Sequence, residues 1–181
     1  LLQGAHDLKT PLALLRLEIA RLPQETSRAR IQAALRRLEQ LADDILFLAE
    51  GRTPEPSLRK ISLKQRLEEL LELFQEEVRI RQLKIERACE DDLVVDADPQ
   101  ALDRLLVNLL DNAVRYAPEG STLRIELRPP ALILENPVGV PDPLGEGVGW
   151  AVIRTVVRQY GWSVHRSVSH GIHRVELRFA P

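Results

Sequence analysis

A short stretch near residue 50 divides this chain into two parts with different hydrophobic patterns. Gly51, Pro54 and Pro56 lie close together there, and this combination ends a helix and gives a short, stiff linker. Before the stretch, apolar residues recur at helical spacing; after it, helical segments alternate with short β-like segments. We therefore expect a helical domain at 1–52, a linker at 53–57 and an α/β domain at 58–181.

The helical part has two apolar stripes, which predict helices at 1–22 and 28–50 joined by a turn that begins at Pro23. Leu8, Leu12, Leu15, Ile19 and Leu22 form the first stripe, and Ile31, Leu35, Leu38, Leu41, Ile45 and Leu48 form the second. A lone hairpin has too small a core to bury both apolar faces. We therefore expect a homodimer.

The segment His6-Asp7-Leu8-Lys9-Thr10-Pro11 places reactive groups at the start of the first helix. A neutral imidazole is a good phosphoryl acceptor, and Asp7 can fix the tautomer of His6 and take its proton. Thr10 lies one turn further along the same face, where its hydroxyl can hold a water. The alternative is a histidine near a helix start, with Asp7 stabilising the helix dipole.

A second group of polar residues lies on a helix that is expected to start at Asp98-Pro99. Asn108 and Asn112 are four residues apart, so their amide oxygens share a face and can help complete an oxygen shell around Mg²⁺. Arg115 can reach a phosphate, and Tyr116 offers a ring to a base. The alternative is a pair of solvated asparagines.

Alternating glycines form a third feature, in the segment Gly145-Glu146-Gly147-Val148-Gly149 before a helix expected at 150–159. Such glycines let backbone amides approach phosphates at a helix N-terminus. A tight connection between two elements is the alternative.

Together these segments resemble the sensor histidine kinases of two-component systems. The segment at His6 resembles the phosphoacceptor box, residues 103–116 resemble the N-box, and the glycine-rich turn resembles the G2 box. The resemblance covers nearly the whole chain in family order. It implies a dimeric four-helix bundle, followed by an α/β two-layer sandwich of the histidine-kinase, gyrase and Hsp90 ATPase type.

The resemblance also implies roles. ATP would phosphorylate His6, with Asp7 as base, and an aspartate of a response regulator would receive the phosphoryl group. Thr10 would serve dephosphorylation of that regulator. Mg²⁺ and phosphates would bind Asn108 and Asn112. The nucleotide would contact Arg115, Tyr116, Asn136, Gly139, Gly145, Gly147 and Gly149.

The adenine region departs from the family pattern, in which an Asp precedes spaced glycines. Asn136 is our choice for that position because its carbonyl can accept a hydrogen bond from the adenine amine. Glu135 is the competing register. Residues 141–144 alone separate this region from the glycine-rich turn, where the family has a longer ATP lid. Either the lid is very short or part of it is absent from this sequence.

Composition limits the remaining possibilities. The net charge is −2, so no broad basic surface favours nucleic acid. The single cysteine, Cys89, excludes a disulfide within the chain. No apolar run approaches the ~20 residues of a membrane-spanning helix. His165, His170 and His173 lack zinc-like spacing and are expected in a turn and on the surface.

Because the chain has no methionine, we expect a fragment: the cytoplasmic part of an inner-membrane sensor protein. One alternative function is a degenerate kinase that acts mainly as a response-regulator phosphatase or dimeric scaffold, which the altered adenine region and short lid favour. The other is a gyrase- or Hsp90-type ATPase, against which the phosphoacceptor hairpin argues.

Overall fold

The computed structural model describes residues 26–50, 57–89, 91–138 and 147–180. His6, Asp7 and Thr10 lie outside these residues, as do Gly139 and Gly145. The chain divides into two compact units, one of residues 1–54 with 146–152 and one of residues 55–145 with 153–181. The domain boundaries expected from the sequence stay a prediction.

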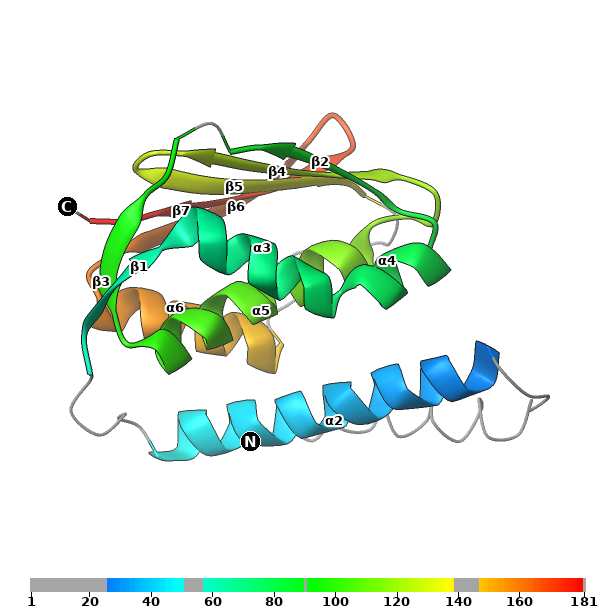
Figure 1. Ribbon diagram of the computed structural model, residues 1–181, viewed down its shortest axis with the longest axis horizontal. Coiled ribbons are helices and arrows are strands. Elements are labelled where there is room, and N and C mark those ends of the chain that lie inside the picture. The colour runs from blue at the N-terminus through cyan, green and yellow to red at the C-terminus, as the bar shows by residue number, and fades with distance from the viewer. Residues whose placement is uncertain (1–25, 51–56, 90, 139–146, 181) are drawn as a thin grey trace. The chain divides into compact units, whose positions relative to one another are not determined.

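Helix α2 runs from Thr26 to Glu50 (Figure 1), close to the predicted 28–50. Its apolar stripe is half-buried at Leu38, Leu41, Ile45 and Leu48, whereas Leu46 on another face is 58% exposed. Within the helix, Gln40 Nε2 donates to Asp44 Oδ1 at 3.1 Å. No helix in the described ranges combines the length and apolarity that a membrane span requires.

The described residues of the other unit form two sheets. The larger has five strands in the order β2-β4-β5-β7-β6, antiparallel except for the parallel pair β2 and β4. Its strands are β2 (Lys84–Ala88), β4 (Thr122–Arg128), β5 (Ala131–Pro137), β6 (Ser163–Ser169) and β7 (Ile172–Arg178). The smaller sheet pairs β1 (Arg59–Ser62) with β3 (Val94–Ala97).

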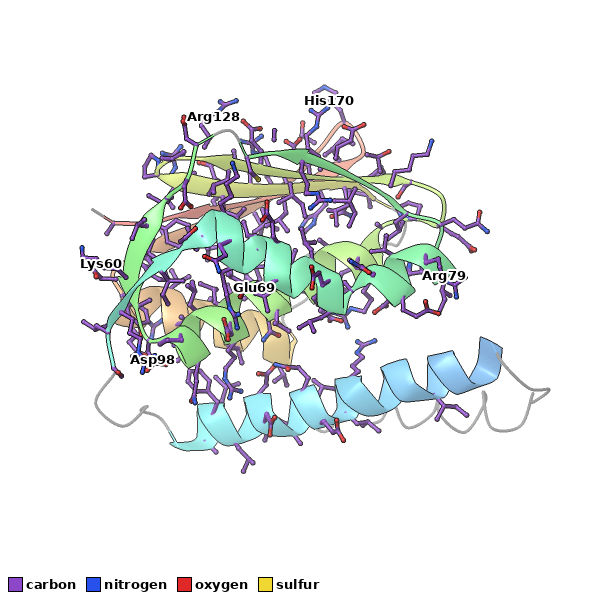
Figure 2. The ribbon with its side chains drawn as sticks, viewed as in Figure 1. Lys60, Glu69, Arg79, Asp98, Arg128 and His170 are labelled. Atoms are coloured by element: carbon purple, nitrogen blue, oxygen red, sulfur yellow. The ribbon has the colours of Figure 1, made fainter. Side chains whose placement is uncertain are left out.

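The two faces of the larger sheet differ because its strands alternate apolar and charged residues. Ile125, Leu134 and Val175 are cross-strand partners in one buried row, on the face that the helices cover (Figure 1). The opposite face carries ion pairs such as Arg174–Glu135 and Arg124–Glu86. Figure 2 shows Arg128 and His170 on the side of the sheet away from the helices. One covered and one open face make a two-layer α/β sandwich.

The helices are α3 (Leu63–Leu73), α4 (Gln75–Ile80), α5 (Pro99–Tyr116) and α6 (Val148–Gln159). Ser62 caps α3 as its side chain accepts from Gln65 N at 3.1 Å. The apolar residues from Leu67 to Val78 keep helical spacing, which predicts one helix from Leu63 to about Arg81. That prediction is wrong, because the helix breaks at Phe74, whose N–H bonds to Leu71 O, three residues back, at 3.1 Å. Helix α6 begins two residues earlier than predicted, so Gly149 lies inside its first turn.

Candidate functional site

The chain path brings three segments to one end of the larger sheet. Helix α5 ends at Tyr116 and β4 starts at Thr122 after a short connection. Strand β5 is antiparallel to β4, so the last residues of β5 lie beside the first residues of β4. Strand β7 is antiparallel to β5, and Asn136 is the cross-strand partner of His173. The end of α5, the end of β5 and the start of β7 therefore meet.

Helix α5 is fixed at its start by a side-chain cap. Asp98 Oδ1 accepts from Gln100 N at 2.9 Å and Ala101 N at 3.2 Å, and Pro99 occupies the first helical position. These contacts satisfy the free amides of the first turn. The sequence prediction of this helix start is confirmed.

A two-pronged ion pair joins α5 to α3. Arg66 Nε donates to Asp103 Oδ1 at 2.6 Å, and Arg66 Nη2 donates to Asp103 Oδ2 at 2.5 Å. Both side chains are about 30% exposed, at 31% and 29%. The planar guanidinium matches both carboxylate oxygens, so the contact fixes orientation as well as distance. Arg66 thereby holds the helix that carries the asparagines.

Asn108 and Asn112 share one face of α5, as their spacing predicted. Asn108 is 7% exposed, and its Nδ2 donates to Arg104 O at 2.9 Å. Asn112 is half-buried, and its Oδ1 accepts from Arg115 Nη2 at 2.6 Å. A carbonyl oxygen has a second lone pair, so Asn112 Oδ1 keeps an acceptor position. Both residues offer the oxygen type that Mg²⁺ takes in proteins.

Besides Asn112, Arg115 lies close to Asp111 and Tyr116 on the last turns of α5. Its Cζ is 4.3 Å from the centre of the Tyr116 ring, and its Nε is 3.8 Å from Asp111 Oδ2. That Nε is buried and makes no hydrogen bond within the part of the chain that the structure describes. This nitrogen faces the Asp111 carboxylate without a hydrogen bond to it. Arg115 and Tyr116 lie together, and their contacts with a nucleotide stay a prediction.

Arg81 supports the loop that follows α5, a role that sequence reasoning missed. Its Nη2 donates to Ala117 O at 2.5 Å, and its backbone oxygen accepts from Gly120 N at 3.0 Å. The two bonds hold the connection between α5 and β4 against the end of α4. No short-range pattern reveals such a contact, since it spans 36 residues of sequence.

Asn136 and Glu135 are on opposite faces of β5. Asn136 is 2% exposed and continues the buried row of Leu132 and Leu134. Glu135 is on the open face, where its Oε1 accepts from Arg174 Nη1 at 2.7 Å. Asn136 is thus on the side of the sheet that α5 packs against. This arrangement favours Asn136 over Glu135 for the nucleotide, and the role itself stays a prediction.

The orientation of the Asn136 amide follows from the one hydrogen bond that its side chain makes within the described residues. Its Nδ2 donates to Pro137 O at 3.0 Å. A carbonyl oxygen accepts only, so the amide nitrogen must face it and Oδ1 must point elsewhere. Asn136 Oδ1 has no hydrogen-bond partner among the residues that the structure describes. It can accept from a ligand amine.

His173 is buried, so its expected surface position is wrong. It is 6% exposed and lies on the same face of β7 as Val175 and Leu177, two and four residues further on, which are both buried on the helix-covered face. The alternation along β7 was the signal that could have found it. Burial, with the nearby charge of Arg166, lowers the pKa of His173 below its ordinary value. Its Nε2 is buried without a hydrogen-bond partner in the described ranges.

The two described glycines of the glycine-rich turn belong to the other compact unit. Gly147 precedes α6, and its carbonyl accepts from Trp150 N and Ala151 N, both at 3.1 Å. Gly149 lies in the first turn of the helix. Their predicted contacts with phosphates stay a prediction.

Comparison with protein-family models finds no match. Several curated proteins are nevertheless similar to this chain in sequence. The chain is 28% identical to "Sensor histidine kinase CusS" of Escherichia coli (strain K12), over 84% of this chain and 39% of the relative. It is 28% identical to "Sensor histidine kinase GtrS" of Pseudomonas aeruginosa, over 96% of this chain and 40% of the relative. The chain therefore spans about two-fifths of the length of these relatives.

Solved structures share the fold. The Acinetobacter baumannii histidine kinase AdeS superposes with a TM-score of 0.67 at 21% identity, covering 97% of both chains. Full-length ShkA in complex with AMPPNP gives 0.61 at 19% identity, covering 99% of this chain and 44% of ShkA. ThkA in complex with the response regulator protein TrrA gives 0.60 at 18% identity, covering 98% of this chain and 60% of its counterpart.

Proposed function

We propose that this chain, which is related in sequence and fold to the sensor histidine kinases, is the phosphotransfer core of such a kinase. It would transfer the γ-phosphoryl group of ATP to His6 and then to an aspartate of a response regulator. One observation carries the proposal. Asn112, Arg115 and Tyr116 end α5 at the end of the sheet that also holds Asn136.

The nucleotide would lie over this end of the helix-covered face. Asn136 Oδ1 has no partner among the described residues and suits the base amine. The planar guanidinium of Arg115, next to the Tyr116 ring, suits a phosphate oxygen. An acceptor for the base and a donor for the phosphates thus occur at the same end of the sheet, as a nucleoside triphosphate requires.

Mg²⁺ fits the polar face of α5. Asn108 and Asn112 bring two amide carbonyls to that face, and oxygen ligands of this kind suit the ion when phosphates and water complete the shell. When bound, Mg²⁺ supplies charge neutralisation at the phosphates. Residues of the chain would do the rest: Arg115 would orient the phosphates, and Asn136 would orient the base.

At His6 the chemistry would consist mainly of positioning. The nitrogen of the neutral imidazole attacks the γ-phosphorus, the bond to the leaving ADP oxygen breaks, and Asp7 takes the imidazole proton. The phosphoryl group then passes to a regulator carboxylate, and Thr10 supports its later removal by water. ThkA was solved with a response regulator, which supports a partner of this class. The hairpin would pair with a second copy as a four-helix bundle.

The test is incubation of the chain with Mg²⁺ and [γ-³²P]ATP, followed by exposure of the labelled protein to acid and to base. A phosphorylated histidine loses its label in acid and keeps it in base. We expect such a label on the unaltered chain and none on His6→Ala. His170→Gln is the matched control because His170 lies in the exposed β6–β7 turn, and it should label normally. Label that persists on His6→Ala would disprove the acceptor assignment.

A phosphatase or scaffold function is the second candidate, because the adenine region carries the amide of Asn136 where an acid is usual. Titration with Mg²⁺·ADP separates the two candidates. A kinase core binds the nucleotide, whereas a degenerate core does not bind it and still accelerates loss of phosphate from a phosphorylated regulator. Thr10→Ala should then abolish that acceleration.

A further inference from the structure

Two adjacent side chains at the end of the sheet are buried but keep an unsatisfied polar atom. Asn136 is 2% exposed and His173 is 6% exposed. Asn136 Oδ1 and His173 Nε2 have no hydrogen-bond partner among the described residues. His173 Nε2 is itself buried, and a buried polar group without a hydrogen-bond partner destabilises the fold. Native structures rarely keep one unless a ligand or a water satisfies it.

The backbone register places these side chains together. Asn136 on β5 is the direct cross-strand partner of His173 on β7, and both continue the apolar row of the helix-covered face. Directly opposed residues have Cβ atoms roughly 5 Å apart. That spacing lets the two side chains contact neighbouring atoms on the edge of one flat ring.

The two groups are chemically complementary. Asn136 offers the acceptor Oδ1, which faces away from Pro137 O, because its Nδ2 donates one N–H to that oxygen at 3.0 Å. The lowered pKa of His173 keeps its imidazole neutral at pH 7, so it has one N–H and one lone pair. A ring edge with an amine next to an unprotonated nitrogen would satisfy an acceptor and a donor. Adenine has such an edge at its 6-amine, whereas guanine has a carbonyl oxygen at that ring position, which cannot donate to Asn136 Oδ1.

We propose that His173 and Asn136 form a base-reading pair, in which Asn136 Oδ1 accepts from the adenine amine and His173 Nε2 donates to a neighbouring ring nitrogen. The inference rests on the proposed function, because it names which part of the nucleotide this end of the sheet reads. It adds His173 as a residue that contacts the nucleotide and selects the base.

The test compares the affinity of four Mg²⁺-bound nucleotides by calorimetric titration of the whole chain. They are ADP, the diphosphate of purine riboside, which lacks the amine, and 1-deaza-ADP and 7-deaza-ADP, which each lack one ring nitrogen near it. We expect the unaltered chain to bind one deaza nucleotide about three- to tenfold more weakly than ADP, the effect of one lost hydrogen bond.

Two substitutions assign the bonds. His173→Leu removes both ring nitrogens at similar volume, so the variant should bind ADP more weakly. It should no longer distinguish ADP from the deaza nucleotides (the deaza penalty), but it should still bind the nucleotide without the amine more weakly than ADP (the amine penalty). Asn136→Leu should give the reverse pattern. His173→Gln keeps a side-chain N–H donor and should restore part of the deaza penalty, which also covers the case that His173→Leu does not fold.

His165→Gln is the matched control, because His165 is exposed on β6 opposite Glu176, and it should leave all four affinities unchanged. If His173→Leu weakened every nucleotide by the same factor, a structural role would explain His173 and the base-reading pair would be disproved. If the unaltered chain bound ADP and both deaza nucleotides with equal affinity, the base-reading pair would also be disproved, and the kinase proposal would remain intact. If no nucleotide bound, both proposals would fail.

Discussion

Arg115 Nη2 donates to Asn112 Oδ1 at 2.6 Å, so the two residues of α5 that most plainly suit phosphate and metal are bonded to each other. The contact holds the guanidinium next to the Tyr116 ring. The Arg115 side chain is therefore preorganised for a nucleotide, and it would lose little conformational entropy on binding.

Replacing Arg115 should therefore weaken nucleotide binding. Arg115→Ala removes a charged donor, and we expect Mg²⁺·ADP to bind about tenfold to 100-fold more weakly, as calorimetric titration would show. Arg115→Lys keeps the charge and should recover only part of the affinity, because an ammonium lacks the planar fork. Arg124→Ala, on the open face beside Glu86, is the control. Equal affinities for Arg115→Ala and Arg124→Ala would contradict the assignment.

Asn136→Asp should destabilise the fold, although it introduces the acid expected at this position from the resemblance to sensor histidine kinases. Asn136 Nδ2 donates to Pro137 O at 3.0 Å, and a carboxylate would set an oxygen against that carbonyl. We expect a loss of about 1–3 kcal/mol in the free energy of unfolding at pH 7, measured by urea denaturation. The half-buried Asn112→Asp is the comparison and should cost less. An unchanged midpoint for Asn136→Asp would show that the amide orientation is wrong.

The ion pair between Arg66 and Asp103 should couple α3 to α5. A double-mutant cycle of Arg66→Ala and Asp103→Ala, measured by urea denaturation, should give a coupling energy of about 1 kcal/mol, because both side chains are partly buried and the contact is two-pronged. The pair Arg79–Glu76 is more exposed, at 73% and 45%, and serves as the control with a smaller coupling. A coupling near zero for Arg66–Asp103 would mean that packing alone joins the helices.

His173 should make stability depend on pH below neutrality. Its pKa is lowered in the folded state, so in mildly acidic solution the unfolded chain binds a proton that the native chain does not. Stability then falls as pH drops below about 6.5, and it levels off once the folded-state pKa is passed. Urea midpoints between pH 7.5 and pH 5 would measure this. The dependence should be smaller in His173→Leu, and an identical profile for both proteins would exclude His173 as its source.

Local chemistry predicted most elements. Asp98-Pro99 marks the start of α5, and the apolar stripe at 28–50 marks most of α2. In each case the signal lies within a few residues of the element that it specifies. The same is true of the shared face of Asn108 and Asn112, which follows from helical spacing alone.

What sequence reasoning missed depends on contacts between distant segments. The break at Phe74 was hidden because the apolar spacing continues through it to Val78. His173 is buried by tertiary packing, although its parity with Val175 was visible. The sequence alone could not decide whether Glu135 or Asn136 takes the adenine position, because only the pairing of β5 with β7 shows which face of the sheet each residue occupies. Arg81 reaches Ala117 across a loop that no periodicity describes.

Asp98 joins three segments through different atoms of one residue. Its Oδ1 caps α5, its Oδ2 accepts from Ser57 N at 3.2 Å, and its backbone N–H donates to the Tyr160 hydroxyl at 3.0 Å. Ser57 is the last residue of the predicted linker. The Asp98 carboxylate therefore ties the end of the predicted linker to the first turn of the helix that carries Arg115 and Tyr116. Replacing this one side chain would remove the helix cap and the tie to the linker together.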